Sequence, residues 1–264
     1  MTRRPSPTTD AAPFGAAIRN RKIQMLLGLF VATTVAAGAA LATQAAEPAI
    51  TSRAQIEEIV RDYILEHPEI LPQAMERLQA KRVGAVIDSK RGEIETPFAG
   101  AWEGAQNGDI VLVEFFDYAC GYCRASLPDI TRLVGEDKKV KVVYRELPIL
   151  SEESNAAAHV SLLAAERNLY MPFHKALYAA GQVTRETILK AAASVGIDRK
   201  AAEAAIADKR YAAEIEKNVR LAQALGASGT PTFVVGGQVL GGAVGYDGLK
   251  KAVAEERAKA KPAT

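Results

Sequence analysis

The sequence predicts an α/β domain in which a helical insertion separates the second strand from the third. Two hydrophobic runs, Ile110–Phe116 and Lys139–Glu146, have the length and composition of strands, and a hairpin follows much later, at Pro231–Leu240. Between them, residues 154–225 consist of Ala-rich amphipathic segments with helical spacing. The order strand, helix, strand, several helices, hairpin, helix therefore predicts a small α/β domain with an insertion at about residues 151–228.

Composition indicates an ordinary globular protein. The chain has 264 residues, of which 48% are hydrophobic and 24% charged, so that it can bury a sizeable core. The net charge of +2 is uneven, because residues 1–46 carry five basic side chains and one acidic side chain, which leaves −2 for the remainder. A nearly neutral body with one tryptophan and no basic stripe argues against nucleic acid as a partner.

Residues 1–46 have the features of an export signal. Basic residues at positions 19, 21 and 22 precede an uncharged run over residues 23–42, and small residues suited to cleavage follow. An uncleaved membrane anchor is the alternative, because about 20 apolar residues span a bilayer. Both alternatives place the body in an oxidising compartment outside the cytoplasm.

Residues 47–90 predict a helical segment that precedes the main domain. Thr51 or Ser52 caps a first helix, which ends at His67-Pro68, and a second helix runs from about Pro68 to Lys81. Apolar residues recur at helical spacing in both, as Ile56, Ile59, Val60, Tyr63, Ile64, Ile70, Leu71, Ala74, Met75 and Leu78. This stripe either packs on its own domain or joins other copies in a homo-oligomer through residues 51–82.

The main domain is expected over residues 91–264. It begins irregularly, because Val83–Asp109 is rich in glycine and has few periodic apolar residues. The run Ile110–Phe116 then predicts a strand that is buried on both faces. A helix from Cys120 to about Val134 follows it, and a last helix is expected over residues 247–258.

The chain has two cysteines, Cys120 and Cys123, at the start of a predicted helix. A structural zinc site would need four ligands, and no second cysteine pair or suitably spaced histidine exists, so we expect no metal and no cofactor. Cysteines three apart in one helical turn lie on one face, close enough for a disulfide. The unpaired N–H groups and the dipole of the helix favour a thiolate at Cys120, whereas the less exposed Cys123 suits a resolving role.

The segment Glu114-Phe-Phe-Asp-Tyr-Ala-Cys-Gly-Tyr-Cys-Arg124, the later Gly229-Thr-Pro-Thr-Phe233 and the helical insertion together resemble the DsbA-like thioredoxin-fold thiol:disulfide oxidoreductases. The chain is most similar to the ScsC and Com1-like branch of that family. The resemblance covers about residues 105–260, and residues 51–82 resemble the N-terminal segment of the same branch.

The resemblance implies a role for each residue of the motif. Cys120 is the expected nucleophile and Cys123 the resolving thiol of a redox-active disulfide, with a potential tuned by Gly121 and Tyr122. Pro231 corresponds to the family's cis-proline, and Thr230 before it would present its backbone to a bound substrate.

Glu114 corresponds to the family's buried acid, which could hold or relay a proton for the buried thiol. The alternative is an edge position with its carboxylate in water. Arg124 either supports the thiolate or is simply solvated. Asp117 and Tyr118 are expected to be turn residues at the end of the strand, not catalytic ones.

The resemblance also implies a function. It predicts a periplasmic enzyme that exchanges disulfides with reduced or misoxidised exported proteins and is reset by a membrane redox partner. Oxidase, isomerase and reductase activity all stay open: a homo-oligomer would favour isomerase, and Gly-Tyr differs from the Pro-His dipeptide of strongly oxidising members. The alternative is a copper(I)-handling or redox-inactive binding protein that uses the same thiolates, since thiolates select copper(I).

Overall fold

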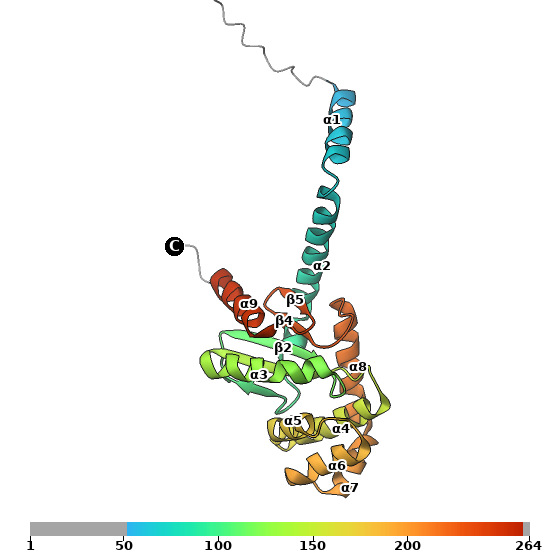
Figure 1. Cartoon of the computed structure of the whole chain (residues 1–264), viewed down its shortest axis with the longest axis vertical. Helices are drawn as coiled ribbons and strands as arrows, with labels where there is room; N and C mark the ends of the chain where they lie inside the picture. The colour runs from blue at the N-terminus through green and yellow to red at the C-terminus, as the bar shows by residue number, and fades with distance from the viewer. Residues whose placement is uncertain (1–51, 261–264) are drawn as a thin grey trace, which may run out of the picture. The chain divides into compact units, whose positions relative to one another are not determined.

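The structure, a computed structural model, describes residues 52–260 (Figure 1). The predicted export signal or anchor lies outside the described residues. Within 52–260, no helix is long and apolar enough to cross a membrane. The contacts within the chain divide it into two units, the first ending at Ile56 and the second beginning at Glu57. The sheet and the helices packed on it belong to the second unit.

The described residues form one mixed sheet with the strand order β1-β3-β2-β4-β5. Its central strand β2 pairs in parallel with β3 and antiparallel with β4, and the two outer pairs are also antiparallel. The strands are β1 (Trp102–Gly104), β2 (Ile110–Phe116), β3 (Val140–Glu146), β4 (Thr232–Val235) and β5 (Gln238–Gly241). The two predicted strands and the predicted hairpin are confirmed.

One helix joins the two parallel strands, and five form the insertion. Helix α3 (Gly121–Glu136) connects β2 to β3, and α9 (Gly245–Ala260) follows the hairpin and packs beside α3. The insertion between β3 and β4 comprises α4 (Glu152–Glu166), α5 (Tyr170–Ala179), α6 (Arg185–Ser194), α7 (Arg199–Ile206) and α8 (Lys209–Ala224). The thioredoxin-like α/β fold with a helical insertion between the second and third predicted strands is therefore confirmed.

Each face of the sheet is covered by its own apolar cluster. Leu112 and Phe116 of β2 belong to the larger cluster, which includes both cysteines and residues of α3, α9 and the insertion. Val113 and Phe115 point to the opposite face and pack with residues of α2 and α8. Because β2 is apolar on both faces, it is the buried centre of the sheet, as predicted.

The second N-terminal helix is longer than predicted. Helix α2 (Ile70–Glu95) continues through Gly84 and Gly92, so the expectation of an irregular stretch is wrong over residues 83–95. Its last turns bury Ile87 and Ile94 completely against the sheet. This packing outweighs the cost of about 1 kcal/mol that each helical glycine carries.

The first N-terminal helix, α1 (Arg53–Glu66), begins as the sequence predicts. Ser52 Oγ accepts the N–H of Gln55, whose side chain accepts the N–H of Ser52 in return, as in a capping box. No residue of α1 is buried. The stripe along α1 and the first turns of α2 is exposed at Ile59, Val60, Tyr63, Leu71, Met75 and Leu78. The structure therefore does not pack these side chains against the described residues of their own chain.

Candidate active site

The two cysteines lie where the central strand meets a helix. Cys120 is the N-cap of α3, and its Sγ accepts the backbone N–H of Cys123 at 3.2 Å. A sulfur in this position takes the place of the oxygen that usually caps a helix, and it meets the positive end of the helix dipole. Both side chains are free thiols, 5% exposed at Cys120 and 1% at Cys123.

Cys123 is the better shielded thiol, as predicted. Burial raises the pKa of its thiol strongly, and the negative charge of Glu114 raises it further. A thiolate at Cys123 is therefore unfavourable, and Cys123 needs a proton whenever its sulfur is released from a disulfide.

Glu114 is a buried acid, so the alternative of an edge position in water is wrong. Its side chain is 2% exposed, and Oε1 has no hydrogen-bond partner among the described residues. Burial raises the pKa of this carboxyl well above its ordinary value, with smaller contributions from Cys120 and Glu103. In the sheet, Glu114 lies between Tyr144 of β3 and Phe233 of β4. The protein therefore holds a carboxyl that favours its protonated form on the face of the sheet that carries the cysteines.

The loop before β4 reaches the first cysteine from far along the chain. The peptide bond between Thr230 and Pro231 is cis, as the resemblance implies. The thiol of Cys120 donates a hydrogen bond to the carbonyl oxygen of Thr230 at 3.2 Å. Of the remaining predicted residues, Gly121 and Tyr122 are exposed, Tyr122 at 72%. The structure thus brings all seven predicted site residues to one end of β2 and α3.

Arg124 fits neither of its two predicted descriptions. Its guanidinium donates to the carbonyl oxygen of Gly181, in the loop after α5. It is only partly exposed and joins the start of α3 to the helical insertion.

Asp117 has a larger part in the site than sequence reasoning expected. It lies in the turn after β2, as predicted, but its buried carboxylate accepts three backbone N–H groups. One comes from Ala119 at 2.7 Å, and the others from Ile149 and Leu150 at 2.8 and 2.9 Å. Its carbonyl oxygen accepts the N–H of Cys120. No sequence pattern joins residues 117 and 149, so this link could not be predicted.

A buried polar cluster adjoins the site and was also missed. Tyr118 bonds Ser161 of α4 at 2.8 Å and His174 of α5 at 3.1 Å, and Tyr170 donates to Glu146 at 3.3 Å. Burial lowers the pKa of His174 to about 3 and raises the pKa of Glu146 well above its ordinary value. Both side chains are therefore neutral over much of the pH range, which suits a sparsely hydrated interior.

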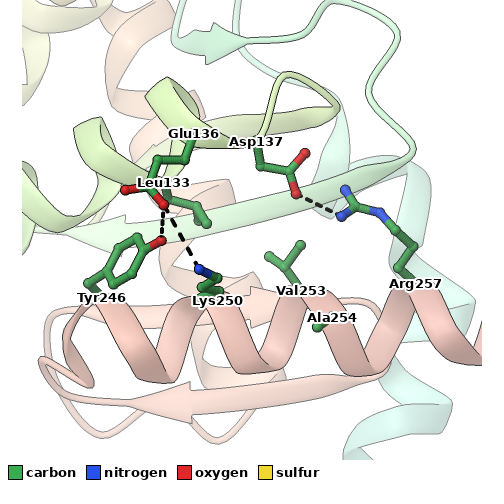
Figure 2. A pocket seen from close by; sticks show the side chains of 8 residues that line it. All are labelled: Leu133, Glu136, Asp137, Tyr246, Lys250, Val253, Ala254 and Arg257. Carbon is green, nitrogen blue, oxygen red and sulfur yellow. Dashed lines mark hydrogen bonds and ion pairs between the residues drawn. The ribbon is translucent and has the colours of Figure 1, made fainter. Parts of the chain in front are cut away.

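A cavity of about 290 Å³ between α3 and α9 lies at the other end of α3 from the cysteines (Figure 2). Its charged side chains pair with one another across the two helices. Glu136 accepts from Tyr246 and lies 3.9 Å from Lys250, and Asp137 pairs with Arg257 at 2.7 Å. These pairs join α3 to α9, and we assign the cavity no part in the chemistry.

Comparison with known families gives two matches on different parts of the chain. Residues 111–254 match the DSBA-like thioredoxin domain. Residues 53–82 match the N-terminal domain of the copper resistance protein ScsC.

Several solved structures are similar to this chain in both fold and sequence. A thioredoxin-like oxidoreductase from Silicibacter pomeroyi is 38% identical, with a TM-score of 0.60, over 64% of this chain and 96% of that one. The thiol-disulfide exchange protein alpha-DsbA2 from Wolbachia pipientis is 28% identical, with a TM-score of 0.62, over 67% and 97%. A linker-deletion mutant of Proteus mirabilis ScsC is 28% identical, with a TM-score of 0.61, over 81% and 100%.

Curated relatives resemble the chain over a part of their length. They include Na(+)/H(+) antiporter NhaA 3 of Salinispora tropica, 28% identical over 190 residues, which are 69% of this chain and 29% of the antiporter. NhaA of Herminiimonas arsenicoxydans is 30% identical over 148 residues, 54% of this chain and 23% of the antiporter. The chain thus spans less than a third of these relatives.

Proposed function

The chain belongs to the DSBA-like thioredoxin domain family, and on that premise we propose that it is an exported enzyme that exchanges disulfides with folding proteins. One observation carries the proposal: the sulfur of Cys120 lies at a helix N-terminus, between the N–H of Cys123 and the carbonyl of Thr230. This geometry supports a reactive first thiol with a resolving thiol one turn away.

In the oxidising direction, a client thiolate attacks Sγ of Cys120 in the Cys120–Cys123 disulfide. The S–S bond breaks, a mixed disulfide forms on Cys120, and the sulfur of Cys123 takes up a proton. A second client thiolate then attacks the client sulfur of the mixed disulfide and releases Cys120 as a thiolate. The client loses two electrons, which the two cysteines gain, and a membrane redox partner would later remove them.

Glu114 is the proposed source of the proton for Cys123. The carboxyl is buried and favours its protonated form, and its charge is one of the causes that raise the pKa of Cys123. Transfer of a proton between these two groups avoids two negative charges in one buried site. In the reducing direction, the same carboxylate would accept the proton from Cys123.

Thr230 is the proposed backbone contact for the client. Its carbonyl oxygen accepts the Cys120 thiol in the dithiol form seen here. In the disulfide or the mixed disulfide, Cys120 has no proton to donate, so this oxygen is free to accept an N–H from the client chain. The exposed Tyr122 and Gly121 would lie beneath that chain.

The N-terminal helices bear on the direction of exchange. Their exposed apolar stripe supports a homo-oligomer through residues 51–82, in which several sites hold one client while its disulfides are reshuffled. We therefore favour isomerase activity over simple oxidation. A periplasmic location is proposed on the predicted export signal and on the description of one relative, from Salmonella enterica, as a periplasmic thioredoxin-like protein.

Two activity assays test the proposal. Reduction of insulin and refolding of scrambled ribonuclease are measured with the wild-type protein and with Cys120→Ala. We expect both activities in the wild type, neither in the variant, and loss of ribonuclease refolding when residues 47–82 are removed. Absence of both activities from the wild type would contradict the enzyme.

Copper(I) binding is the second candidate function. It is favoured by two adjacent thiols and by the match of residues 53–82 to a domain of a copper resistance protein. Competition with a copper(I) chelator separates the two functions. Tight binding that depends on Cys120 and Cys123, in a protein that catalyses no exchange, would replace the enzyme with a copper-handling protein.

A further inference from the structure

Residues 117–124, which include both cysteines, are tied to the helical insertion and to the loop that leads into it. The hydroxyl of Tyr118 bonds side chains of α4 and α5, and Arg124 donates to the carbonyl oxygen of Gly181. Asp117 makes three further links, two through its carboxylate and one through its carbonyl oxygen. The position of the cysteines at the end of β2 therefore depends on contacts with distant parts of the sequence.

The carboxylate of Asp117 is shared between the cysteine turn and the loop after β3. Oδ1 accepts the N–H of Ala119 at 2.7 Å, a bond to the second residue along the chain that closes a tight turn. Oδ2 accepts the N–H groups of Ile149 and Leu150 at 2.8 and 2.9 Å. Hydrogen bonds to a carboxylate are stronger than those between neutral groups. One side chain, 1% exposed, thus holds two segments of backbone at a fixed spacing.

The carbonyl oxygen of Asp117 holds the first cysteine itself. It accepts the N–H of Cys120 at 3.1 Å, and the hydroxyl of Tyr178 in α5 donates to the same oxygen at 3.3 Å. Cys120 has the extended backbone of an N-cap, with φ −76° and ψ 113°, from which its Sγ accepts the N–H of Cys123. In a looser turn, the sulfur would spend part of its time away from the positive end of α3.

The negative charge of Asp117 acts mainly on a different carboxyl. Burial raises the pKa of Glu146, at the end of β3, and the charge of Asp117 adds to this rise. That charge is not among the main causes of the raised pKa of Glu114 or of Cys123, which burial raises first. Asp117 therefore acts on the cysteines through the geometry of its hydrogen bonds.

We propose that Asp117 is the positioning residue that holds Cys120 at the N-terminus of α3, because it anchors the cysteine turn to the helical insertion and to the loop after β3. The insertion is then a support for the redox pair as well as a part of the core. This inference rests on the proposed function, in which Cys120 is the nucleophile, and adds the residue that keeps its sulfur in place.

Alkylation of Cys120 in the reduced full protein tests the proposal without a client. The rate constant of its reaction with iodoacetamide is measured as a function of pH, and mass spectrometry identifies the modified cysteine. Because the thiolate is the species that reacts, the pH at half-maximal rate reports how well the helix N-terminus stabilises that thiolate. A loss of stability alone leaves this midpoint in place while the protein is folded, which near-ultraviolet circular dichroism checks.

Asp117→Asn keeps one acceptor oxygen for the cysteine turn. It replaces the other with an amide nitrogen, which cannot accept the N–H groups of Ile149 and Leu150. We expect the midpoint of the pH profile to rise and the rate constant at neutral pH to fall about fivefold, which is the size of effect that loss of a helix cap produces.

A second variant and a control accompany this one. Tyr178→Phe removes one donor to the carbonyl oxygen of Asp117 and keeps the ring in the core, so it should shift the midpoint in the same direction by a smaller amount. Asp208→Asn is the matched control, because Asp208 also accepts the N–H of the second residue along the chain, at 2.8 Å, but lies at the start of α8. It should change neither the midpoint nor the rate constant.

An unchanged midpoint in folded Asp117→Asn would overturn the proposal. So would a lower midpoint, because it would show that the charge of Asp117 governs the thiolate and its hydrogen bonds do not. If Asp117→Asn does not fold, Tyr178→Phe decides: a higher midpoint supports the proposal and an unchanged one overturns it. Failure of the proposed function is a different result, in which the wild-type protein neither reduces insulin nor refolds scrambled ribonuclease.

Discussion

At the scale of single residues, the site places a buried carboxyl, that of Glu114, on the same face of the sheet as a pair of thiols. Glu114 has no hydrogen-bond partner for Oε1 among the described residues, and burial holds its pKa well above the ordinary value. A carboxyl whose pKa is higher in the folded protein than in the unfolded chain stabilises the fold at low pH. That stabilisation is lost as the pH rises from the unfolded pKa through the folded pKa.

Glu114→Gln should therefore flatten the pH dependence of stability in the reduced protein. Between pH 5 and pH 8 the wild type should lose free energy of unfolding relative to the variant, because the folded protein keeps a proton on Glu114 that the unfolded chain has released. Urea unfolding of both proteins in a phosphine reductant measures this difference.

Glu136→Gln is the control. Hydrogen bonds from Tyr246 and Arg132 lower the pKa of Glu136, so its contribution is lost only at acidic pH. Parallel stability curves for the wild type and Glu114→Gln from pH 5 to pH 8 would contradict the assignment of Glu114 as a buried, protonated acid.

At the scale of elements, a buried guanidinium joins three parts of the chain. Arg145 of β3 is 1% exposed and donates to the carbonyls of Glu93, Ile94 and Thr96, at the end of α2. It also pairs with Glu214 and Asn218 of α8. The last carbonyls of a helix have no partner within the helix, so Arg145 supplies donors to this end of α2 from another element of the chain.

Arg145→Gln should destabilise the protein by about 3–5 kcal/mol, because it leaves several buried carbonyls without a donor and removes one of the two cations that pair with Glu214. Arg145→Lys should recover only part of this, since an ammonium lacks the planar fork of the guanidinium. Denaturant unfolding measures both. Arg199→Gln, which breaks an exposed ion pair with Glu203, is the matched control and should have little effect. A comparably small effect at Arg145 would contradict the role of this residue.

The same elements show what the sequence could and could not predict. Periodicity and length were enough for β2, β3 and the hairpin, because these follow from local patterns. The roles of the redox motif came instead from its resemblance to a known family. The predicted second helix is shorter than α2, because the glycines of α2 suggest an end. What extends the helix is the burial of Ile87 and Ile94 and the hydrogen bonds from Arg145, which are long-range contacts. Strand β1 has three residues and forms only by pairing with β3. The link from Asp117 to Ile149 likewise depends on the folded chain.

At the scale of the whole molecule, the exposed stripe of the N-terminal helices is the surface through which we propose that several copies, and with them several redox sites, come together. Seven large hydrophobic side chains between Glu57 and Leu78 are exposed, which is costly for a monomer in water. A helical segment with such a stripe gains stability when several copies bury it together. The proposed homo-oligomer follows from this surface.

Leu71→Asp should shift the protein from an oligomer to a monomer, because it would place a charge in a buried apolar seam. Light scattering of the full exported form measures the change. Leu150→Asp is the control, because this leucine lies outside the stripe but is as exposed as Leu71, at 54% against 53%. A wild-type monomer, or an oligomer that survives Leu71→Asp unchanged, would contradict assembly through residues 51–82.

The most direct test of the redox chemistry is a trapped mixed disulfide. Cys123→Ser, incubated with insulin, has a nucleophile but no resolving thiol, so the attack of Cys120 on an insulin disulfide should stop at the covalent intermediate. Mass spectrometry should then show insulin bound to Cys120, released by dithiothreitol and absent from Cys120→Ser. No adduct on Cys123→Ser, or an equal adduct on Cys123 in Cys120→Ser, would contradict Cys120 as the nucleophile.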